Sequence, residues 1–236
     1  MKYAMVVDLQ KCVGCGNCIF ACKAENNTPG DINWCDKITR TVGTFPKVRY
    51  EYLPKLCNHC TDAPCVKVCP VTPKAMYKAD NGLTLHSVDR CIGCQMCVGA
   101  CPYGVISFNA KAPHQDWQDT RALVPGGTYS PKEMLLAAGG QASPHANPER
   151  GNTYPVVRPE AKVEKCTLCD HRLAKGLRPA CVEACPPQAL TVGDLDDPRS
   201  EVSQQLKPHK ARTLQPEKGT RPNVYYIRSF NHPRQA

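Results

Sequence analysis

Short apolar stretches separated by turn residues predict several β-strands in this chain. Asn81-Gly82 lies between two of these stretches, and this dipeptide suits the type I′ turn of a β-hairpin. The expected strands are Tyr3–Val7, Ala75–Lys78, Leu83–His86, Gly104–Phe108, Ala189–Val192 and Asn223–Ile227. The longest apolar runs, such as Met134–Ala138, are far too short to cross a bilayer. The pattern therefore predicts a soluble protein with several small β-structures.

Four cysteine motifs of two types alternate along the chain. The first type reads C-x2-C-x2-C-x3-C, and its members are Cys12, Cys15, Cys18 and Cys22, then Cys91, Cys94, Cys97 and Cys101. The second type has a longer gap in its middle, and its members are Cys57, Cys60, Cys65 and Cys69, then Cys166, Cys169, Cys181 and Cys185. Short helices are expected to start at the third cysteine of each motif. The predicted fold class is therefore α+β, built from small ferredoxin-like units.

The spacing of these cysteines is typical of proteins that bind 4Fe–4S clusters. Three cysteines two residues apart can wrap one cubane from a tight loop, and the fourth follows one helical turn after the third. A single helix face cannot easily fold back onto its own loop's cluster, but it can bridge to a neighbouring one, as in two-cluster ferredoxins. Pro70, Pro102 and Pro186 follow three of the motifs and help to end the ligand helix, whereas Lys23 follows the first. We therefore expect sixteen cysteines to hold four 4Fe–4S clusters.

Zinc is the rival interpretation, because C-x2-C pairs are also typical of zinc ribbons. Zinc sites rarely need three cysteines in one C-x2-C-x2-C loop, which two of the motifs contain. Cys35 belongs to no motif and is either a spare or redox-active ligand or, in the interpretation we favour, a small buried or semi-exposed thiol. His59 and His171 lie inside or beside motifs and could ligate or tune a cluster, although packing and hydrogen bonding to cluster sulfur or backbone are favoured.

Composition and charge fit a metal-organised protein. The chain has 236 residues, of which 17 are cysteines and only 6% are aromatic. Because large core-forming side chains are scarce, metal binding is expected to organise the fold. The formal charge of +9 would suit a nucleic-acid-binding protein, but the basic residues are dispersed along the chain. Four thiolate-bound clusters would also add a charge of roughly −8, which leaves the loaded protein near neutral. The odd number of cysteines argues against a disulfide framework, and no secretory leader precedes Asp8.

A long segment without cysteine, Lys111–Arg158, separates the third motif from the fourth and is rich in Pro and Gly. Loops of this length are usually functional or disordered. We interpret the segment as an insertion that docks on a partner subunit. On the residues alone, two cluster arrangements stay open. Neighbouring motifs can pair in order, or the middle two can pair while the ends of the chain close around them.

The motifs resemble those of the four-cluster ferredoxin-like iron–sulfur subunits of the dimethyl sulfoxide reductase family of molybdopterin oxidoreductases. The similarity covers nearly the whole chain and is carried by Val7–Gly16, Leu56–Cys60, Pro64–Pro70, Ala100–Asn109 and Lys165–Arg172. Asn147–Gly151 and Gly193–Pro198 make the chain most similar to the small subunits of respiratory arsenate reductases. The resemblance implies an electron-transfer subunit that is not itself a catalyst. Subunits that serve polysulfide, thiosulfate, tetrathionate or selenium oxyanions are similar too.

The resemblance also implies how the clusters are distributed between two interleaved ferredoxin-like units. Residues 1–50 and 159–236 are expected to form the outer unit with a C-terminal tail, 51–110 the inner unit and 111–158 the insertion. In the inner unit, one cluster is held by Cys57, Cys60, Cys65 and Cys101, and its neighbour by Cys91, Cys94, Cys97 and Cys69. In the outer unit, one cluster is held by Cys12, Cys15, Cys18 and Cys185, and the other by Cys166, Cys169, Cys181 and Cys22.

Finally, the resemblance implies partners and a location. The expected partner is a large catalytic subunit with a molybdopterin guanine dinucleotide cofactor. The expected electron donor is a quinol-oxidising membrane protein or a cytochrome. The complex is expected to be periplasmic and exported on the partner's leader. Two alternative functions stay open. The chain could be a stand-alone polyferredoxin, although the long insertion argues against this. It could also be a nucleic-acid-binding module held together by zinc.

Overall fold

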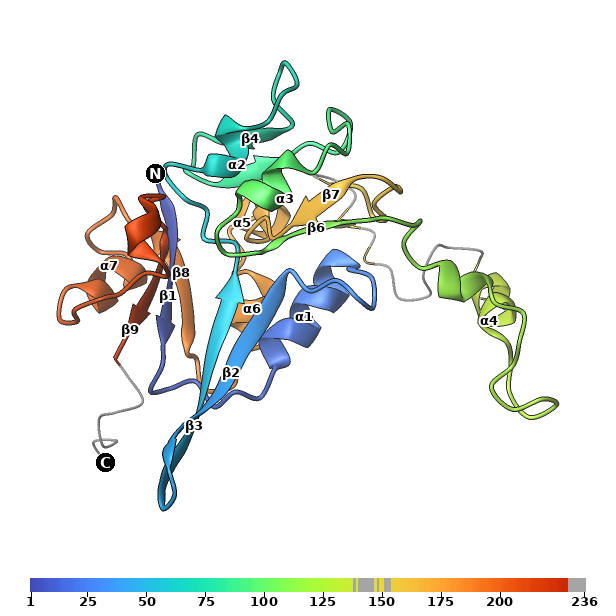
Figure 1. Ribbon diagram of the computed structural model, residues 1–236, viewed down its shortest axis with the longest axis horizontal. Coiled ribbons are helices and arrows are strands. Elements are labelled where there is room, and N and C mark those ends of the chain that lie inside the picture. The colour runs from blue at the N-terminus through green and yellow to red at the C-terminus, as the bar shows by residue number, and fades with distance from the viewer. Residues whose placement is uncertain (138, 140–146, 148, 151–153, 229–236) are drawn as a thin grey trace.

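The computed structural model describes residues 1–137, 139, 147, 149–150 and 154–228. It contains short helices and small sheets, in agreement with the predicted mixture of α and β structure (Figure 1). The helices are α1 (Asn17–Asn26), α2 (Pro64–Lys67), α3 (Met96–Ala100), α4 (Pro131–Ala137), α5 (Asp170–Leu173), α6 (Ala180–Glu183) and α7 (Glu201–Leu206), with 3-10 turns η1 (Gln115–Gln118) and η3 (Pro216–Lys218). The strands are β1 (Tyr3–Asp8), β2 (Cys35–Thr44), β3 (Lys47–Leu56), β4 (Met76–Lys78), β5 (Thr84–His86), β6 (Ile106–Phe108), β7 (Val163–Lys165), β8 (Leu190–Asp194) and β9 (Val224–Ile227).

Strands from the two ends of the chain form one three-stranded sheet. Its order is β8-β1-β9, with β1 antiparallel to β8 and parallel to β9. Ala4 and Val6 pack with Val202 of α7 on one face, whereas Met5 and Val7 join the main core on the other. Because β1 is buried on both faces, its sequence is continuously apolar rather than alternating. The strands expected at Tyr3–Val7, Ala189–Val192 and Asn223–Ile227 are thereby confirmed within a residue or two.

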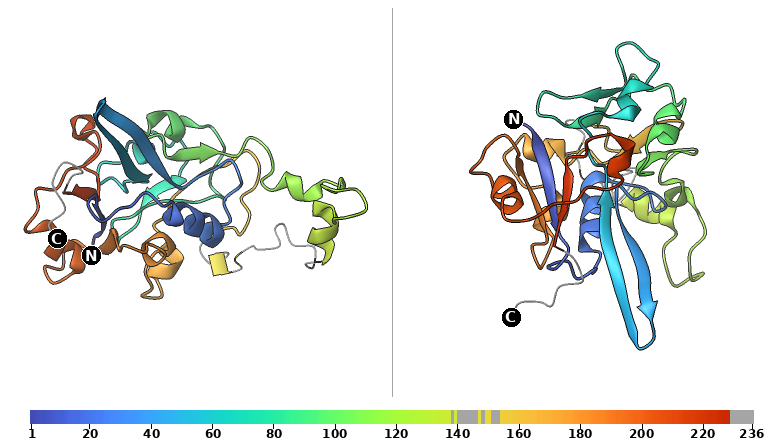
Figure 2. Two further views of the ribbon diagram at one scale, coloured as in Figure 1. Left: turned by 90° about the horizontal axis from the view of Figure 1, so that it is seen from below. Right: turned by 60° about the vertical axis from the view of Figure 1, so that its left-hand side comes forward.

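The remaining small sheets join segments beside the cysteine motifs. β4 and β5 form the predicted hairpin across Asn81-Gly82, but the expected type I′ turn is wrong, because Gly82 has a φ of 79° and the φ of Asn81 is not positive. β6 pairs with β7, so the residues before and after the insertion lie side by side. The insertion thus leaves and re-enters the body at one place. Its part around α4 extends away from the body (Figures 1 and 2), whereas Arg150, Tyr154 and Arg158 near its end are buried in the body. Pro148 and Gly151, in the Asn147–Gly151 stretch, are outside the described residues.

The longest element of the fold is a hairpin that the sequence analysis did not predict. β2 and β3 pair over ten residues each, and their distal end projects from the body (Figure 2). Phe45 in the turn is 88% exposed, and Val48 and Tyr50 on β3 are also exposed. The boundary expected at residue 50 falls inside β3, so it does not coincide with the end of an element.

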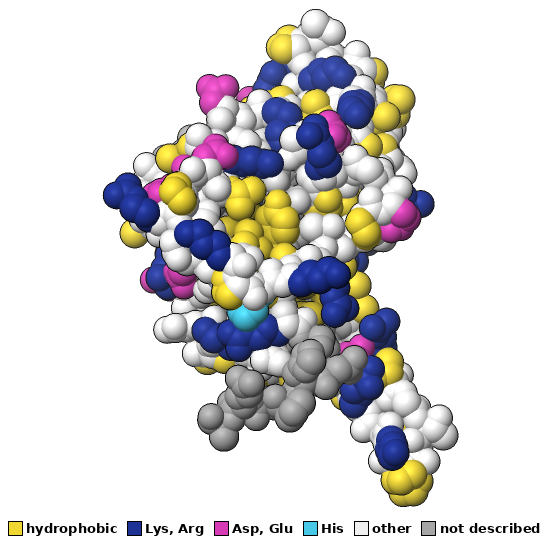
Figure 3. Space-filling view, turned by 90° about the vertical axis from the view of Figure 1, so that its left-hand side faces the viewer, with side chains coloured by type: hydrophobic (Ala, Val, Ile, Leu, Met, Phe, Trp, Pro, Cys, Tyr) yellow, Lys and Arg dark blue, Asp and Glu magenta, His cyan; other side chains and the backbone are white. Residues whose placement is uncertain are grey.

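Helices begin one residue before the third cysteine of each motif, close to the expected position. α1 begins at Asn17, α2 at Pro64, α3 at Met96 and α6 at Ala180. Apart from α1 these are one-turn helices, too short to be stable alone, so their stability depends on what they pack around. Within the described part of the chain, no helix is long and apolar enough to cross a membrane. On the face shown in Figure 3, Lys and Arg side chains are spread among apolar and acidic ones, consistent with their dispersal in the sequence.

Candidate functional site: four convergent sets of cysteines

One set of cysteines opens toward the surface beside the base of the long hairpin. Cys12, Cys15, Cys18 and Cys185 line a single cavity together with apolar side chains such as Val13 and Leu190. Cys15 is exposed. Burial first, and then Cys18, Cys185 and Cys15, raise the pKa of the Cys12 thiol. The cavity therefore collects thiols from both ends of the chain, as the resemblance implied for one cluster.

A second set lies on another part of the surface, beside the base of the insertion. Cys69, Cys91, Cys94 and Cys97 line an apolar cavity with Met76 and Val163 among its walls. Cys94 is exposed. Burial, followed by Cys91 and Cys94, raises the pKa of Cys97 to about 11. This cavity again combines three cysteines of one motif with the last cysteine of another.

The third and fourth sets are interior. Burial and the nearby Cys57, Cys101 and Cys60 raise the pKa of Cys65, to about 12. Burial and the nearby Cys169, Cys22 and Cys166 raise the pKa of Cys181 well above its usual value. The members of these sets are Cys57, Cys60, Cys65 and Cys101 in one, and Cys22, Cys166, Cys169 and Cys181 in the other. The structure thus brings the members of all four expected sets together, while their ligation of clusters stays a prediction.

The loop between the first two cysteines shares one backbone feature in all four motifs. The residue before the second cysteine has a positive φ: 69° at Gly14, 43° at His59, 74° at Gly93 and 57° at Leu168. In two of these loops this residue's N–H donates to the preceding cysteine sulfur, from Gly93 to Cys91 Sγ at 3.4 Å and from Leu168 to Cys166 Sγ at 3.3 Å. Such hydrogen bonds stabilise thiolates and help to set the reduction potentials of iron–sulfur clusters. The shared geometry of these loops within one chain indicates that all four surround the same kind of group.

His59 offers a hydrogen-bond donor without an acceptor in the described protein. It is fully buried, and burial lowers the pKa of its imidazole well below the usual value, so the ring is neutral. Its Nδ1 accepts from the Thr84 N–H at 3.2 Å, which places the ring proton on Nε2. Nε2 is buried and has no partner among the described residues. An acceptor beside the Cys57–Cys60 loop that is not part of the polypeptide, such as a cluster sulfide, would satisfy this N–H.

Fully buried cations are the feature of the site that sequence reasoning missed. Arg150, Arg158 and Lys165 are each 0% exposed. Arg158 pairs with the buried carboxylate of Glu164, its Nε lying 2.9 Å from Oε2. Trp34 Nε1 also donates to Glu164, at 2.8 Å. Nothing in the local sequence pattern separates these residues from ordinary surface charges, because their burial depends on the tertiary fold.

Lys165 differs from the two arginines in its surroundings. Its Nζ donates to the carbonyl oxygens of Thr84 and Cys166. In the part of the chain that the structure describes, no carboxylate lies within ion-pair distance of it. Burial disfavours its ammonium, but the nearby sulfurs of Cys57, Cys65 and Cys166 outweigh burial and raise the pKa of Lys165. A buried cation of this kind needs an anion, and four thiolates with a cluster supply one, so the residues present fit 4Fe–4S binding.

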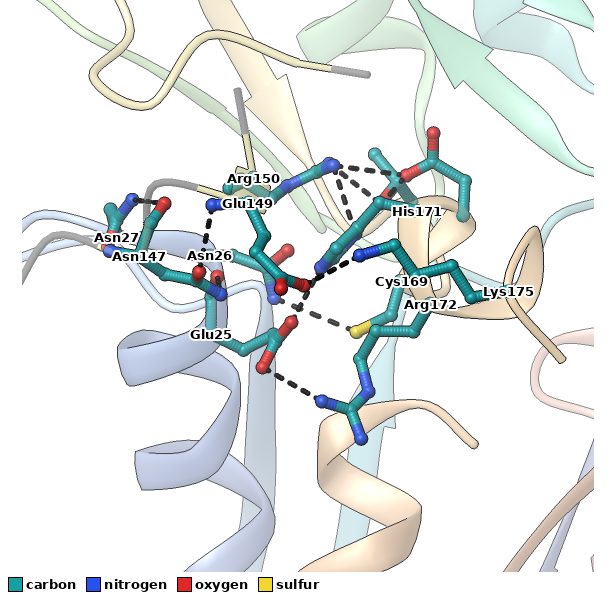
Figure 4. A network of polar contacts seen from close by, with 12 residues as sticks. Glu25, Asn26, Asn27, Asn147, Glu149, Arg150, Cys169, His171, Arg172 and Lys175 are labelled. Carbon is teal, nitrogen blue, oxygen red and sulfur yellow. Dashed lines mark hydrogen bonds and ion pairs between the residues drawn. The ribbon is translucent and has the colours of Figure 1, made fainter. Parts of the chain in front are cut away.

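A polar network covers the interior set that contains Cys169 (Figure 4). Asn26 Nδ2 points toward two sulfurs, Cys22 Sγ at 3.6 Å and Cys169 Sγ at 3.9 Å. Arg150 Nη1 donates to His171 Nδ1 at 3.1 Å, so the ring proton of His171 is on Nε2, which donates to Glu25 at 2.6 Å. His171 therefore positions α5 against α1 through hydrogen bonds to side chains and is not directed at a metal, whereas the favoured interpretation predicted bonds to cluster sulfur or backbone.

Cys35 is the buried thiol that the sequence analysis favoured, but it is not isolated. It begins β2 and is 2% exposed. Its thiol forms a hydrogen bond with Cys18, and this bond, more than any other interaction, lowers the pKa of Cys18 to about 7. Cys35 thus stabilises the thiolate of a neighbouring cysteine from outside the four sets.

Comparison with known proteins agrees with this geometry. Residues 48–118 and 150–195 match a model described as 4Fe-4S dicluster domain, and residues 3–24 match a 4Fe-4S binding domain. The chain is 60% identical to the arsenate respiratory reductase iron-sulfur subunit ArrB of Shewanella sp. strain ANA-3, over 98% of this chain and 97% of the relative. It is 36% identical to a subunit of the selenate reductase of Mesobacillus selenatarsenatis and 32% identical to a subunit of the tetrathionate reductase of Salmonella typhimurium, over 96% of this chain and 72% of each relative.

Proposed function

The chain belongs to the 4Fe-4S iron–sulfur subunits of the dimethyl sulfoxide reductase family, and from this premise we propose that it delivers electrons through four clusters to the catalytic subunit of a respiratory arsenate reductase. The observation that carries the proposal is the convergence of sixteen cysteines into four sets of four. When bound, 4Fe–4S clusters supply one-electron transfer chemistry. The protein positions them and sets their potentials through charge, burial and hydrogen bonds.

We propose that each set holds one cluster and that the four sets form a continuous path. The two cavities with an exposed cysteine, Cys15 and Cys94, are its ends. Cys18 of the first set acts electrostatically on Cys22 and Cys181 of an interior set. Cys57 of the other interior set acts in the same way on Cys166. Cys65 of that interior set and Cys69 of the second surface set are only four residues apart in the chain, which supports the last step of the proposed path.

The substrate assignment rests on degree of similarity. The relative named for arsenate respiration is 60% identical over nearly the full length of both chains. The relatives named for selenate and tetrathionate are 36% and 32% identical. These names all denote reductases of oxyanions, so an electron-transfer subunit of one architecture can serve each substrate. The difference in identity favours arsenate for the complex that contains this chain.

We also propose the partners and location that the resemblance implied. The catalytic partner carries a molybdopterin guanine dinucleotide, the donor is a quinol-oxidising membrane protein or a cytochrome, and the complex is periplasmic. The insertion is proposed to dock on the partner subunit. Its attachment to the body supports this, because β6 and β7 hold it next to the Cys91–Cys97 loop, where Lys162 Nζ donates to the Cys91 carbonyl. A partner bound to the insertion would therefore lie close to an end of the path.

Metal content tests the cluster proposal. We expect anaerobically purified protein to contain about sixteen irons and about sixteen acid-labile sulfides per chain, because four cubanes each contribute four of both. Iron and sulfide assays, with zinc measured on the same samples, check the result. Stoichiometric zinc with little iron would contradict the proposed function, and a strong three-iron signal would contradict complete ligation by four cysteines in each set.

Activity measurements test whether this chain only transfers electrons while the catalytic subunit reduces the substrate. With reduced viologen as electron donor, the purified chain alone is expected to reduce arsenate at no more than background rate, because the thiolates of its four sets are all committed to clusters. The complex with its catalytic subunit is expected to turn over. The same assay with selenate and tetrathionate tests the substrate assignment, which fails if either supports faster turnover than arsenate. Arsenate reduction by the chain alone would refute its role as an electron-transfer subunit.

A further inference from the structure

Lys165 carries a buried charge that the described polypeptide does not neutralise. Its side chain is 0% exposed, and its Nζ donates to the carbonyl oxygens of Thr84 and Cys166. The neighbouring carboxylate in the sequence, Glu164, pairs with Arg158 instead. Lys165 is therefore the uncompensated cation of this part of the described interior.

The ammonium of Lys165 lies between two sets of cysteines. Its Nζ donates to the Cys166 carbonyl of one interior set and forms a hydrogen bond with the Cys57 thiol of the other. Cys166 and Cys57 also act directly on each other, so the sets are adjacent. Each cluster with its four thiolates carries about two negative charges when oxidised and one more when reduced. A single buried cation thus faces two anionic groups that must exchange an electron.

We propose that Lys165 is a positioning residue for electron transfer, which raises the reduction potentials of both interior clusters together. The inference rests on the proposed assignment of the two interior sets to clusters. A positive charge stabilises the reduced, more negative form of a cluster, and its effect is large where water is excluded. Burial alone would lower the potentials of the interior clusters relative to the two that open to solvent. The charge of Lys165 offsets this difference in potential, so that the interior clusters do not become an energetic barrier to electron transfer.

A purely structural role for Lys165 is the alternative. Its hydrogen bonds join β5 to the end of β7, because Thr84 lies in β5 and Lys165 ends β7. Loss of this connection would lower stability, yet it would not lower the potentials of two clusters selectively. Lys78 offers a matched comparison, since its Nζ donates to the Cys60 carbonyl at 3.0 Å. The sulfurs that act on Lys78 are Cys57, Cys60 and Cys65, which all belong to one interior set.

The experiment is a redox titration of the full chain in its reductase complex, followed by electron paramagnetic resonance. In Lys165→Met, which keeps the length of the side chain and removes its charge, two of the four midpoint potentials are expected to fall. At a fixed applied potential, the ratio of reduced to oxidised cluster is expected to decrease at least tenfold. This corresponds to a fall of 59 mV in the midpoint potential of a one-electron couple. In Lys78→Met one potential is expected to fall. The exposed Lys207 provides a control, and Lys207→Met should leave all four potentials unchanged.

Each outcome decides the inference. Unchanged potentials in Lys165→Met, an equal fall of all four, or a fall of only one would overturn it. If Lys165→Met does not retain its clusters, Lys165→Arg provides a second test, because it keeps the positive charge and changes the shape of the side chain. Retention of the clusters in the arginine variant supports the role of the charge. Loss of the clusters in both variants refutes the inference. Failure of the proposed function would be distinct, because the unsubstituted protein would then lack four titratable clusters.

Discussion

The Cys22→Ser variant is expected to lose the cluster of the fourth cysteine motif and to keep the cluster that Cys12 helps to hold. Cys18 and Cys22 lie on the same helix, α1, but they face different groups. Cys18 lines the cavity of Cys12, whereas Cys22 is buried among Cys166 and Cys169. Iron content should fall by about four of sixteen atoms per chain, and electron flow through the complex should be interrupted because the lost cluster is internal to the path.

Iron analysis and paramagnetic resonance of the reduced protein measure this change. Cys35→Ser is the matched control, because Cys35 is buried but belongs to none of the four sets, and a serine hydroxyl can keep the hydrogen bond to Cys18. It should retain all of the iron. Disappearance of the signal from the Cys12 cluster in Cys22→Ser, or of the cluster that contains Cys57, would refute the proposed assignment of cysteines to clusters.

Gly93→Ala is expected to damage the Cys91 cluster without altering any of its ligands. Gly93 has a φ of 74°, and a Cβ at this position would lie 2.2 Å from the carbonyl oxygen of Ala161. That carbonyl cannot move freely, because Ala161 N–H donates to the Asn109 carbonyl at 2.8 Å at the base of the insertion. The left-handed backbone costs about 1–2 kcal/mol and the steric overlap about 1–3 kcal/mol more. We expect the Cys91 cluster to be depleted in consequence.

Gly104→Ala separates the cost of the left-handed backbone from the cost of the steric overlap. Gly104 also has a positive φ, 58°, but a Cβ there would have no described atom within 4 Å. It should therefore lose only the backbone contribution of about 1–2 kcal/mol and retain full iron content. Thermal unfolding of the holoprotein, with iron measured after gel filtration, compares the two variants. Equal losses in both would mean that contact with Ala161 does not contribute to the effect.

The local pattern of the sequence predicted the elements that lie closest to the cysteines. The spacing of the motifs predicted the starts of the ligand helices, and the Asn81-Gly82 turn predicted the hairpin of β4 and β5. The β2–β3 hairpin was missed although Val48, Tyr50 and Tyr52 alternate with polar residues, which is a recognisable strand signal. β3 ends at Leu56, immediately before Cys57, so a cysteine motif rather than a turn residue marks its end.

The environment of the cysteines could not be predicted in the same way. β7 has only three residues and pairs with β6 across the insertion, so no local signal indicates its partner. The burial of Lys165 has a different cause. A lysine normally avoids the interior, and this one is stabilised by thiols that come from two distant motifs. Its role therefore becomes visible only when the tertiary fold has placed Cys57 and Cys166 on either side of it.

The sheet formed by β8, β1 and β9 sets a temporal order for biogenesis. Its central strand, β1, is synthesised long before the parallel edge strand β9, while Cys12 shares a cavity with Cys185. A nascent chain that has emerged only as far as the insertion can complete neither this sheet nor the cavity. Delivery of iron and sulfide to the Cys12 cavity must therefore wait for the fourth motif, so the machinery that loads it acts on a chain in which all four motifs are already present.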